Sequence, residues 1–306
     1  ILCSSYLLAQ NSQPTANDIS RSTQEDTPLI DIELTASDSD GTIESYSISK
    51  QPIHGTLTVT GGDSIYTYTP ELNYVGQDSF LYVAVDDSNA TSNTATVSIT
   101  VTAVNDSPVL TSIGNQFTKE DTDSTITLIA TDVDIATNSQ TLSFIATSDT
   151  ESLVKVSTTS GDGSGSGTLT FDVQKDQNGT AQITVTVKDS EDSTHAETFT
   201  LTVKAVNDPP IAVNDEYTVN EDTELTGNVN VLDNDSDVDS GTLTTVVIDA
   251  VSNGTLTLNS DGTFNYTGTN NFNGSDNFTY QLNDGAGGLD TATATITVTA
   301  INDSPV

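Results

Sequence analysis

The sequence is poor in sulfur. Among its 306 residues Cys3 is the single cysteine, and methionine and tryptophan are absent. One cysteine excludes a disulfide within the chain and a metal site built from several thiolates. The hydrophobic cores must therefore consist of Val, Ile, Leu, Phe and Tyr, and any cross-link between parts of the chain must come from a source other than sulfur.

Positive charge is the second deficiency. Only 7 Lys and Arg residues oppose 44 Asp and Glu residues, which gives a formal net charge of −37. Binding to nucleic acid needs a basic patch, so nucleic acid is excluded as a partner, and the same charge argues against docking to anionic membranes. A compact chain with this charge repels itself. Either solvent and salt tolerate the charge or bound cations neutralise part of it, and the positions of the acids favour cations.

Long hydrophobic runs are also missing. Hydrophobic residues make up 34% of the chain, and no run approaches the ~20 apolar residues that a membrane-spanning helix needs. The apolar residues lie in short alternating runs instead. Small β-sandwich cores are therefore feasible, and wholesale disorder is not expected.

A seven-residue motif divides the chain into repeats. The sequence AVNDSPV at 103–109 returns as AVNDPPI at 205–211 and as AINDSPV at 300–306. The copies are roughly 100 residues apart, which is about the length of one domain. The motif ends a strand-like run with Asn-Asp and then a proline that stiffens the exit. We expect three repeats: repeat 1 over 14–106, repeat 2 over 107–208 and repeat 3 over 209–306.

The first 13 residues, ILCSSYLLAQNSQ, match none of the repeats and form a predicted leader segment. Two interpretations remain open for it: the end of a secretory signal peptide, or a leader from an upstream unit. Because the sequence does not begin with Met, we expect a fragment or a processed product of a longer protein.

Within each repeat the apolar residues recur every second position. In repeat 1, the residues Ala95, Val97, Ile99 and Val101 alternate with Thr and Ser, which is the pattern of a half-buried strand. Similar runs are separated by turns rich in Gly, Asn and Asp, and no segment has a helical period. Repeats 1 and 3 also share the positions of their aromatic residues. The sequence predicts an all-β protein of three tandem Ig-like β-sandwich domains in an elongated array.

Acidic residues recur at four fixed points of the repeats. A Glu follows each junction by about a dozen residues, an Asp-x-Asp ends an early strand, an Asp closes the penultimate strand, and Asn-Asp forms the junction. In chain order the candidates are Glu25, Asp38, Asp40, Asp87 (with Asp86 as the alternative), Asn105, Asp106, Glu120, Asp132, Asp134, Asp189, Asn207, Asp208, Glu221, Asp237, Asp239 and Asp284.

Clusters of oxygen ligands without His or Cys suit a hard cation. Calcium takes six to eight oxygens in flexible geometry, and Asp-x-Asp on a loop supplies two at one point. The alternative is that Asp and Asn are simply common in turns. That alternative accounts for each acid singly but not for the same four points in three repeats. The DNDSDVDSG tract at 233–241 is not an EF-hand, because it lacks the Gly at position 6 and the Glu at position 12.

This combination of motifs resembles the bacterial cadherin-like repeats, which are close to the tandem-95, VCBS and bacterial Ig-like repeats of large surface adhesins. The resemblance covers residues 14–306 and implies calcium ions between successive domains. At each junction the upstream domain would give the Glu, the linker Asn-Asp, and the downstream domain Asp-x-Asp and the late Asp. The first junction would use Glu25, Asn105, Asp106, Asp132, Asp134 and Asp189, and the second Glu120, Asn207, Asp208, Asp237, Asp239 and Asp284.

Two departures from animal cadherins matter. The linker is Asn-Asp-x-Pro instead of a longer Asp-x-Asn-Asp-Asn, and the Asp-Arg-Glu type of motif in the upstream domain is missing. We therefore expect fewer ions per junction than in animal cadherins, with Asp121 and Asp222 as substitutes for the missing acids.

Nothing in the sequence indicates catalysis. The histidines, His54 and His195, lie in polar turns, and no Ser or Cys lies in a nucleophile elbow. Paired carboxylates are abundant, but a glycosidase needs them in a cleft. The predicted function is a calcium-binding, calcium-rigidified stalk of a secreted or cell-surface bacterial adhesin. Its partners would be calcium ions and neighbouring repeats, with another cell surface or a glycan as an alternative partner of a binding module. An accessory region of a secreted hydrolase is a third interpretation.

Overall fold

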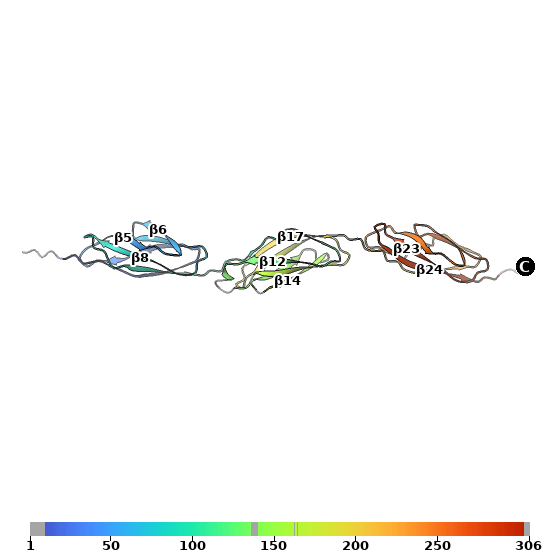
Figure 1. Cartoon of the computed structure of the whole chain (residues 1–306), viewed down its shortest axis with the longest axis horizontal. Coiled ribbons are helices and arrows are strands. Elements are labelled where there is room, and N and C mark those ends of the chain that lie inside the picture. Colours follow the sequence, from blue (N-terminus) through green and yellow to red (C-terminus); the bar gives the residue numbers. More distant parts are fainter. Residues whose placement is uncertain (1–9, 136–139, 162, 164, 303–306) are drawn as a thin grey trace, which may run out of the picture.

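The computed structural model describes residues 10–135, 140–161, 163 and 165–302. Cys3, most of the predicted leader and Asp303 of the third junction motif lie outside the described residues. Three bodies follow one another end to end along one axis (Figure 1). In the described part of the chain, no helix is long and apolar enough to cross a membrane.

Repeat 1 is a β-sandwich of two main sheets. The larger sheet has the strand order β2-β9-β8-β5, the facing sheet has the order β3-β7-β6, and β1 pairs with β4. The strands are β1 (Thr15–Ala16), β2 (Ile19–Gln24), β3 (Leu29–Glu33), β4 (Ala36–Ser37), β5 (Ile43–Lys50), β6 (Gly55–Gly61), β7 (Ile65–Pro70), β8 (Gly76–Asp86) and β9 (Ala95–Thr102).

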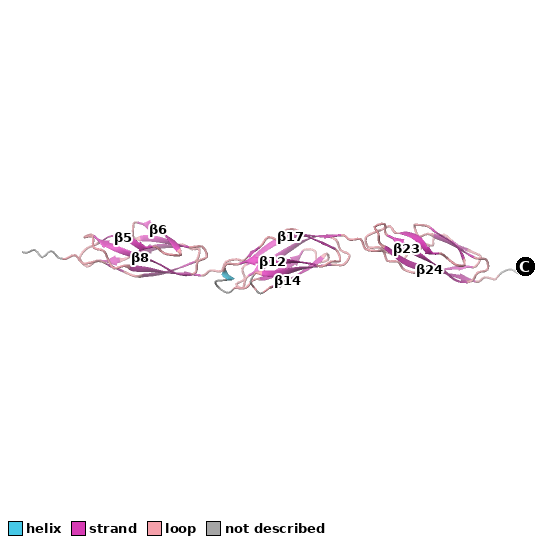
Figure 2. Cartoon of the chain, in the orientation of Figure 1, coloured by secondary structure: helices cyan, strands magenta, loops and turns pink. Residues whose placement is uncertain are grey.

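Repeat 2 has the same larger sheet, β11-β17-β16-β13, facing a sheet with the order β10-β12-β15-β14. Its strands are β10 (Val109–Leu110), β11 (Gln116–Lys119), β12 (Ser124–Thr131), β13 (Ser143–Ser148), β14 (Val154–Ser160), β15 (Ser166–Val173), β16 (Gly179–Lys188) and β17 (Thr194–Lys204). A short helical turn begins at 134–135, between β12 and β13 (Figure 2). No helical period marks this stretch of the sequence, because the two described helical residues are too few to show one.

Repeat 3 pairs a larger sheet, β18-β24-β23-β20, with a smaller one, β19-β22-β21. Its strands are β18 (Asp215–Asn220), β19 (Glu224–Leu225), β20 (Thr244–Asp249), β21 (Gly254–Leu258), β22 (Phe264–Gly268), β23 (Gly274–Asn283) and β24 (Leu289–Thr299).

The first strand of each larger sheet lies parallel to the last one. The pairs are β2 with β9, β11 with β17, and β18 with β24, whereas the other neighbours in these sheets are antiparallel. A chain whose first and last strands run in the same direction enters a sandwich at one end and leaves it at the other. This topology places successive repeats in a row and puts each junction between two sandwich ends.

Each repeat has a separate hydrophobic core. The buried clusters lie within Ala16–Val101, Leu110–Val203 and Val219–Val298. The alternating face that the sequence predicted for β9 is in the core, because Ala95, Val97, Ile99 and Val101 are at most 2% exposed. The predicted fold class, tandem all-β sandwiches of the Ig-like and cadherin-like kind, is confirmed.

Some acids belong to the fold and not to the junctions. Asp78 is 6% exposed, and its carboxylate accepts hydrogen bonds from the Tyr68 hydroxyl at 2.9 Å and from the backbone N–H groups of Ile53 and His54 at 3.0 and 2.9 Å. In repeat 3 the buried Asp276 accepts the same kind of bonds. Burial opposes ionisation of Asp78, but these bonds together hold the pKa of its carboxyl below the ordinary value.

Replacing Asp78 with Asn should lower the free energy of unfolding of repeat 1 by about 2 kcal/mol, because two buried N–H donors compete for one remaining acceptor. The folded-state pKa is lowered, so this stabilisation is present above the unfolded pKa of about 3.9 and is lost as the pH falls through the folded value. Hydrogen exchange of repeat 1 amides measures the change. The exposed Asp31→Asn is the charge-matched control, and equal protection in the two variants would contradict a structural role for Asp78.

Candidate metal centres between the repeats

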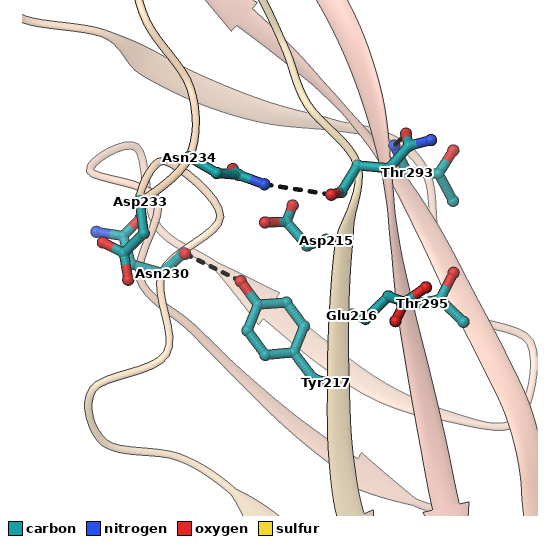
Figure 3. A pocket seen from close by; sticks show the side chains of 9 residues that line it. Asp215, Glu216, Tyr217, Asn230, Asp233, Asn234, Thr293 and Thr295 are labelled. Carbon is teal, nitrogen blue, oxygen red and sulfur yellow. Dashed lines mark hydrogen bonds between the residues drawn. The ribbon is translucent and has the colours of Figure 1, made fainter.

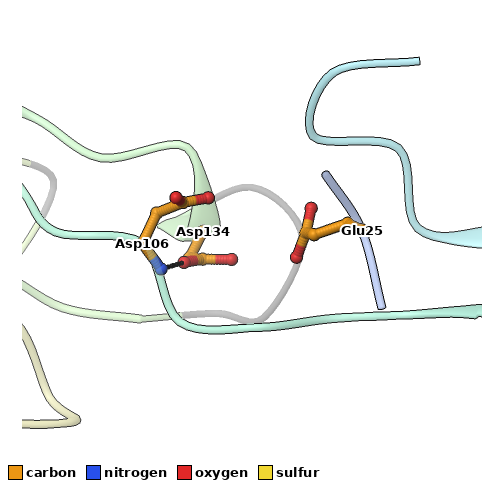
Figure 4. A group of neighbouring side chains, drawn as sticks. All are labelled: Glu25, Asp106 and Asp134. Atoms are coloured by element: carbon orange, nitrogen blue, oxygen red, sulfur yellow. Dashed lines mark hydrogen bonds between the residues drawn. The ribbon is translucent and has the colours of Figure 1, made fainter. Parts of the chain in front are cut away.

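Three carboxylates from two sandwiches meet at the first junction. Glu25 follows β2 in repeat 1, Asp106 belongs to the linker, and Asp134 follows β12 in repeat 2. One oxygen of each lies within 4.8 Å of the others. Figure 4 shows the Glu25 side chain approaching from one side, with Asp106 and Asp134 facing it from the other. Glu25 is 5% and Asp134 2% exposed.

Backbone hydrogen bonds hold these acids in place. Glu25 Oε1 accepts the Val104 N–H at 2.7 Å, so the upstream acid is tied to the strand end that leads into the linker. Asp134 Oδ2 accepts the Asp106 N–H at 2.8 Å. Asp132 Oδ1 accepts the Asp134 N–H at 2.9 Å. The linker is thus pinned to both neighbouring repeats through carboxylates.

The remaining two predicted residues of the first junction also come together. The Asn105 side-chain amide donates to Asp189 Oδ2 at 2.9 Å and to Ser193 Oγ at 2.8 Å. Asp189 Oδ1 accepts backbone N–H groups from the turn that follows it. The structure therefore places all six residues that the sequence assigned to this junction at the same sandwich boundary.

The second junction repeats the arrangement. One oxygen each of Glu120, Asp208 and Asp239 lies within 4.8 Å of the others, and Glu120 is 2% exposed. Asp239 Oδ2 accepts the Asp208 N–H at 2.7 Å, and Glu120 Oε1 accepts the Val206 N–H. Hydrogen bonds also link the other three predicted residues. The Asn207 side-chain amide donates to Asp284 Oδ2, and the Asp239 N–H donates to Asp237 Oδ1.

The second junction holds a further acid that the sequence analysis missed. Asp121, Asp176 and Asp208 form another group with oxygens within 4.8 Å of one another. Asp176 lies in a turn, and its backbone N–H donates to Asp121 Oδ1 at 2.9 Å. The Asn73 N–H donates to Asp26 in the same way at the first junction. Because repeat 1 carries a neutral Asn at this position, no recurring acid marked it. The Lys175 ammonium lies 3.1 Å from Asp176.

The Asp of each Glu-Asp pair has a structural task of its own. Asp26, Asp121 and Asp222 adopt the left-handed conformation with φ of 56°, 56° and 58°, which Asp and Asn tolerate better than other side chains. Each accepts a backbone N–H from a turn in the same repeat. The Glu-Asp pairs therefore recur for two reasons: the Asp forms a turn, and the Glu supplies the junction carboxylate.

The upstream end of repeat 1 carries a degenerate copy of the junction. Asn11 donates to Asp86 Oδ2 at 2.8 Å, and the Ser12 N–H donates to Asp40 Oδ2 at 3.0 Å. These are the contacts that the linker Asn and Asp make at the other junctions. The sequence Asn-Ser-Gln-Pro at 11–14, whose first three residues were predicted as leader, is thus a junction motif with Ser in place of Asp.

Asp86 takes the place that Asp189 and Asp284 have in the other repeats. It is 1% exposed, and hydrogen bonds from Asn11 and from the following turn hold the pKa of its carboxyl down against the opposing effect of burial. Asp87 is exposed and accepts the Thr42 hydroxyl at 3.2 Å, close to Asp38. At the other end of the chain, Glu221 accepts the Ile301 N–H at 2.8 Å, as Glu25 does from Val104.

Equivalent aspartate oxygens lack any hydrogen-bond partner although they are buried. In the described residues these are Oδ2 of the linker acids Asp106 and Asp208, and Oδ2 of the first acid of each Asp-x-Asp, which are Asp38, Asp132 and Asp237. A buried carboxylate oxygen without a donor is costly. A cation satisfies several such oxygens at once, and this all-oxygen donor set fits calcium.

Electrostatics point the same way. Burial, followed by the neighbouring carboxylates Asp134, Asp26 and Asp132, raises the pKa of Asp106. Burial and the acids around it also raise the pKa of Asp208. Each site therefore disfavours its own ionised form, and a bound divalent cation would reverse that preference.

A separate hollow of about 620 Å³ lies on repeat 3. Figure 3 shows β18 side chains along one wall and a loop along the other. The Tyr217 ring packs against Phe264 with centroids 4.9 Å apart, and its hydroxyl donates to the Asn230 carbonyl at 2.9 Å. This half-buried ring packs against the core of repeat 3. The residues around the hollow are Asn214, Asp215, Glu216, Tyr217, Asn230, Asp233, Asn234, Thr293 and Thr295.

Asp215 is a carboxyl in a core position. It pairs with Ala294 across the sheet, where repeat 1 pairs Ile19 with Val97, and it is 7% exposed. The Tyr280 hydroxyl lies 2.8 Å from Asp215 Oδ2 and 3.2 Å from Asp235 Oδ2. Burial raises the pKa of Asp215 to about 6 against the opposing effect of the Tyr280 hydrogen bond.

The pKa of Asp215 is higher in the folded state than in the unfolded state. Between about pH 4 and 6 the folded state therefore keeps a proton on Asp215 that the unfolded state has already released. Repeat 3 should therefore lose stability as the pH rises from 5 to 7.5. Asp215→Ile, the residue of repeat 1, should raise the free energy of unfolding at pH 7.5 by about 1–3 kcal/mol and flatten this dependence. Calorimetric melts at the two pH values test it, with the exposed Glu216→Gln as control. A parent-like pH dependence in Asp215→Ile would refute the assignment.

Comparison with known proteins agrees with this fold. The bacterial cadherin-like domain matches residues 11–103 and 207–300, and the bacterial Ig domain matches 105–202. No curated protein matches the chain. Such repeats are typically extracellular modules of the adhesion type, without enzymatic activity.

Solved cadherin structures share the arrangement. Human CDH23 EC21-23 is 18% identical with a TM-score of 0.57, and the match covers 94% of this chain and 100% of that one. Mouse cadherin-23 EC22-24 is 16% identical with a TM-score of 0.55, covering 95% and 100%. A protocadherin gammaB7 EC3-6 cis-dimer structure is 17% identical with a TM-score of 0.57, covering 94% and 74%. Because the two cadherin-like matches together span more than half of its residues, the chain belongs to the bacterial cadherin-like domain family.

Proposed function

We propose that this chain is a calcium-rigidified spacer of a secreted or cell-surface bacterial adhesin, made of repeats 1, 2 and 3 with the boundaries predicted from the sequence. One observation carries the proposal. At both junctions, carboxylates of two neighbouring sandwiches converge, and the same two aspartate oxygens are buried without a hydrogen-bond donor.

The chain's own residues supply a divided binding site. At the first junction Glu25 is fixed to repeat 1, Asp106 belongs to the linker, and Asp132, Asp134 and Asp189 are fixed to repeat 2. Calcium bound there supplies the positive charge and the coordination that these oxygens lack. Because the ligands belong to different rigid bodies, holding them together restrains the angle between the sandwiches.

Without a cation the same acids drive the junction open. Asp106 lies beside Asp134, Asp132 and Asp26, and their charges raise its pKa in addition to burial. Repulsion between repeats then favours other angles at the linker, so the linker acts as a hinge. The domains themselves keep separate cores. Calcium should therefore control the stiffness of the array and leave the fold of each repeat largely unchanged.

Calcium should raise the thermal stability of the whole chain. A ligand that binds only the folded state stabilises it by RT ln(1 + [Ca²⁺]/Kd). With the Kd of about 10⁻⁴–10⁻³ M that is common for extracellular modules, each site gains about 1–2 kcal/mol at ~5 mM calcium. Scanning calorimetry in calcium and in chelator measures this gain, and the same concentration of magnesium serves as control. Superimposable melts in calcium and chelator would exclude the proposed sites.

Removing charge from the first junction should loosen it without unfolding a domain. Asp132→Asn combined with Asp134→Asn keeps the side-chain shape but takes away two of the acids that a cation would hold. In calcium, small-angle scattering should show a shorter mean maximum dimension and a wider spread of shapes for this variant than for the parent. Circular dichroism should be unchanged.

The matched control is Asp31→Asn with Glu33→Gln, which removes the same charge from exposed positions of β3 in repeat 1. This control should scatter like the parent. If the junction variant is as extended and as uniform as the control in calcium, then Asp132 and Asp134 are ordinary turn acids.

A further inference from the structure

A buried amide stands beside the first junction cluster and has no role in the sites described so far. Gln140 is 5% exposed. Its Nε2 donates to Asn105 Oδ1 and, at 3.4 Å, to Glu191 Oε1. Its Oε1 is buried and has no hydrogen-bond partner. One half of the amide is therefore engaged with the linker, and the other half is an unsatisfied oxygen.

Strand registers show what replaces Gln140 in repeat 3. Ser143 pairs with Lys188, the residue before Asp189, and Thr244 pairs with Asn283, the residue before Asp284. Counting back three residues from each strand start places Gln140 at the position of Gly241. Repeat 3 therefore has no side chain at the place where repeat 2 has a carboxamide.

In repeat 1 the position is Gly41, which also precedes a Thr and an apolar residue. A Cβ added at Gly41 would lie 2.6 Å from Asp38 Oδ2. That oxygen is the counterpart of Asp132 Oδ2 in repeat 2, and both are buried without a donor. In repeat 1 a side chain at this position thus starts next to the unsatisfied oxygen of the Asp-x-Asp motif, whereas a Cβ added at Gly241 in repeat 3 meets no atom within 4 Å.

We propose that the Gln140 carboxamide oxygen is an additional cation ligand of the first junction, with no side-chain counterpart at the positions of Gly41 and Gly241. The inference rests on the proposed function, because it assigns another ligand to the same site. Three buried oxygens without donors, on Asp106, Asp132 and Gln140, then share one explanation.

A neutral oxygen has a particular value at this site. Calcium needs six to eight oxygens, but each further carboxylate adds repulsion when the ion is absent. Gln140 raises the number of ligands without that penalty, and its Nε2 holds the linker residue Asn105 at the same time. The first junction should therefore bind calcium more tightly than the second.

Calcium titration of the complete chain by calorimetry tests this assignment. Gln140→Leu removes the oxygen at similar volume and should weaken the tightest class of sites by roughly tenfold or more. Gln140→Glu keeps an oxygen at that point but loses the amide that donates to Asn105, and it should bind at least as tightly as the parent. The exposed Gln182→Leu in β16 is the control and should bind like the parent.

The possible outcomes separate the alternatives. Equal weakening in Gln140→Leu and Gln140→Glu would mean that Nε2 merely positions Asn105, and parent-like binding in Gln140→Leu would make Gln140 a core residue; either result overturns the assignment. If Gln140→Leu fails to fold in chelator by circular dichroism, Gln140→Gly, the residue of the sister repeats, replaces it with the same expectation. A parent chain that binds no calcium would refute the proposed function as well, whereas a parent that binds with unaffected variants refutes this ligand alone.

Discussion

Carboxylates of neighbouring sandwiches are brought within a few ångströms of one another wherever two repeats meet, and this enforced proximity of like charges governs the rest of the molecule. Glu25 and Asp134 are nearly buried and belong to different repeats. Hydrogen bonds to the backbone fix their directions, so the chain cannot relieve the repulsion by turning a side chain to solvent. A cation or a change of angle between the repeats must relieve it. The fold thus builds a dependence on bound charge into each linker.

Topology determines where that dependence acts. Because the first strand of each larger sheet is parallel to the last, every sandwich receives the chain at one end and releases it at the other. The Glu that follows the first strand and the residues that follow the last strand lie together at the downstream end. The Asp-x-Asp loop and the late Asp lie together at the upstream end of the next repeat. Local strand order therefore assembles each site from segments that are about 80 residues apart within a repeat.

The sequence could predict what recurs and what alternates. Period-two runs such as Ala95–Val101 predicted the strands, and the threefold recurrence of Glu, Asp-x-Asp, Asp and Asn-Asp predicted the members of both junctions. It could not reveal residues that occur once. Asp176 and Gln140 were missed because the sister repeats carry Asn and Gly there, and the motif at Asn11 was missed because Ser12 replaces its Asp. Position in space identifies these residues, whereas repetition does not.

Acids that recur in the sequence do not all have the same role. Asp78 and Asp276 also recur, at one position of repeats 1 and 3, yet their oxygens accept hydrogen bonds from a tyrosine hydroxyl and backbone N–H groups. Such a carboxylate is already stabilised in its charged form and has nothing to gain from a cation. Asp106 and Asp132 are half-buried, and each keeps one buried oxygen without a donor. The number of donors that reach a carboxylate, and not its recurrence, distinguishes an acid whose oxygens the fold already satisfies from one with an oxygen left for a cation.

The same criterion separates the two junctions from each other. The first offers a neutral carboxamide oxygen beside its acids, whereas the second adds the carboxylate of Asp176 with the Lys175 ammonium 3.1 Å away. An exposed ion pair of this kind contributes little to stability, so Lys175 offsets only part of the added repulsion. A bound cation would therefore neutralise more negative charge at the second junction, but that junction offers fewer neutral oxygens as ligands. Two linkers with one motif thus have different surroundings, and their difference comes from the residues that the repeats do not share.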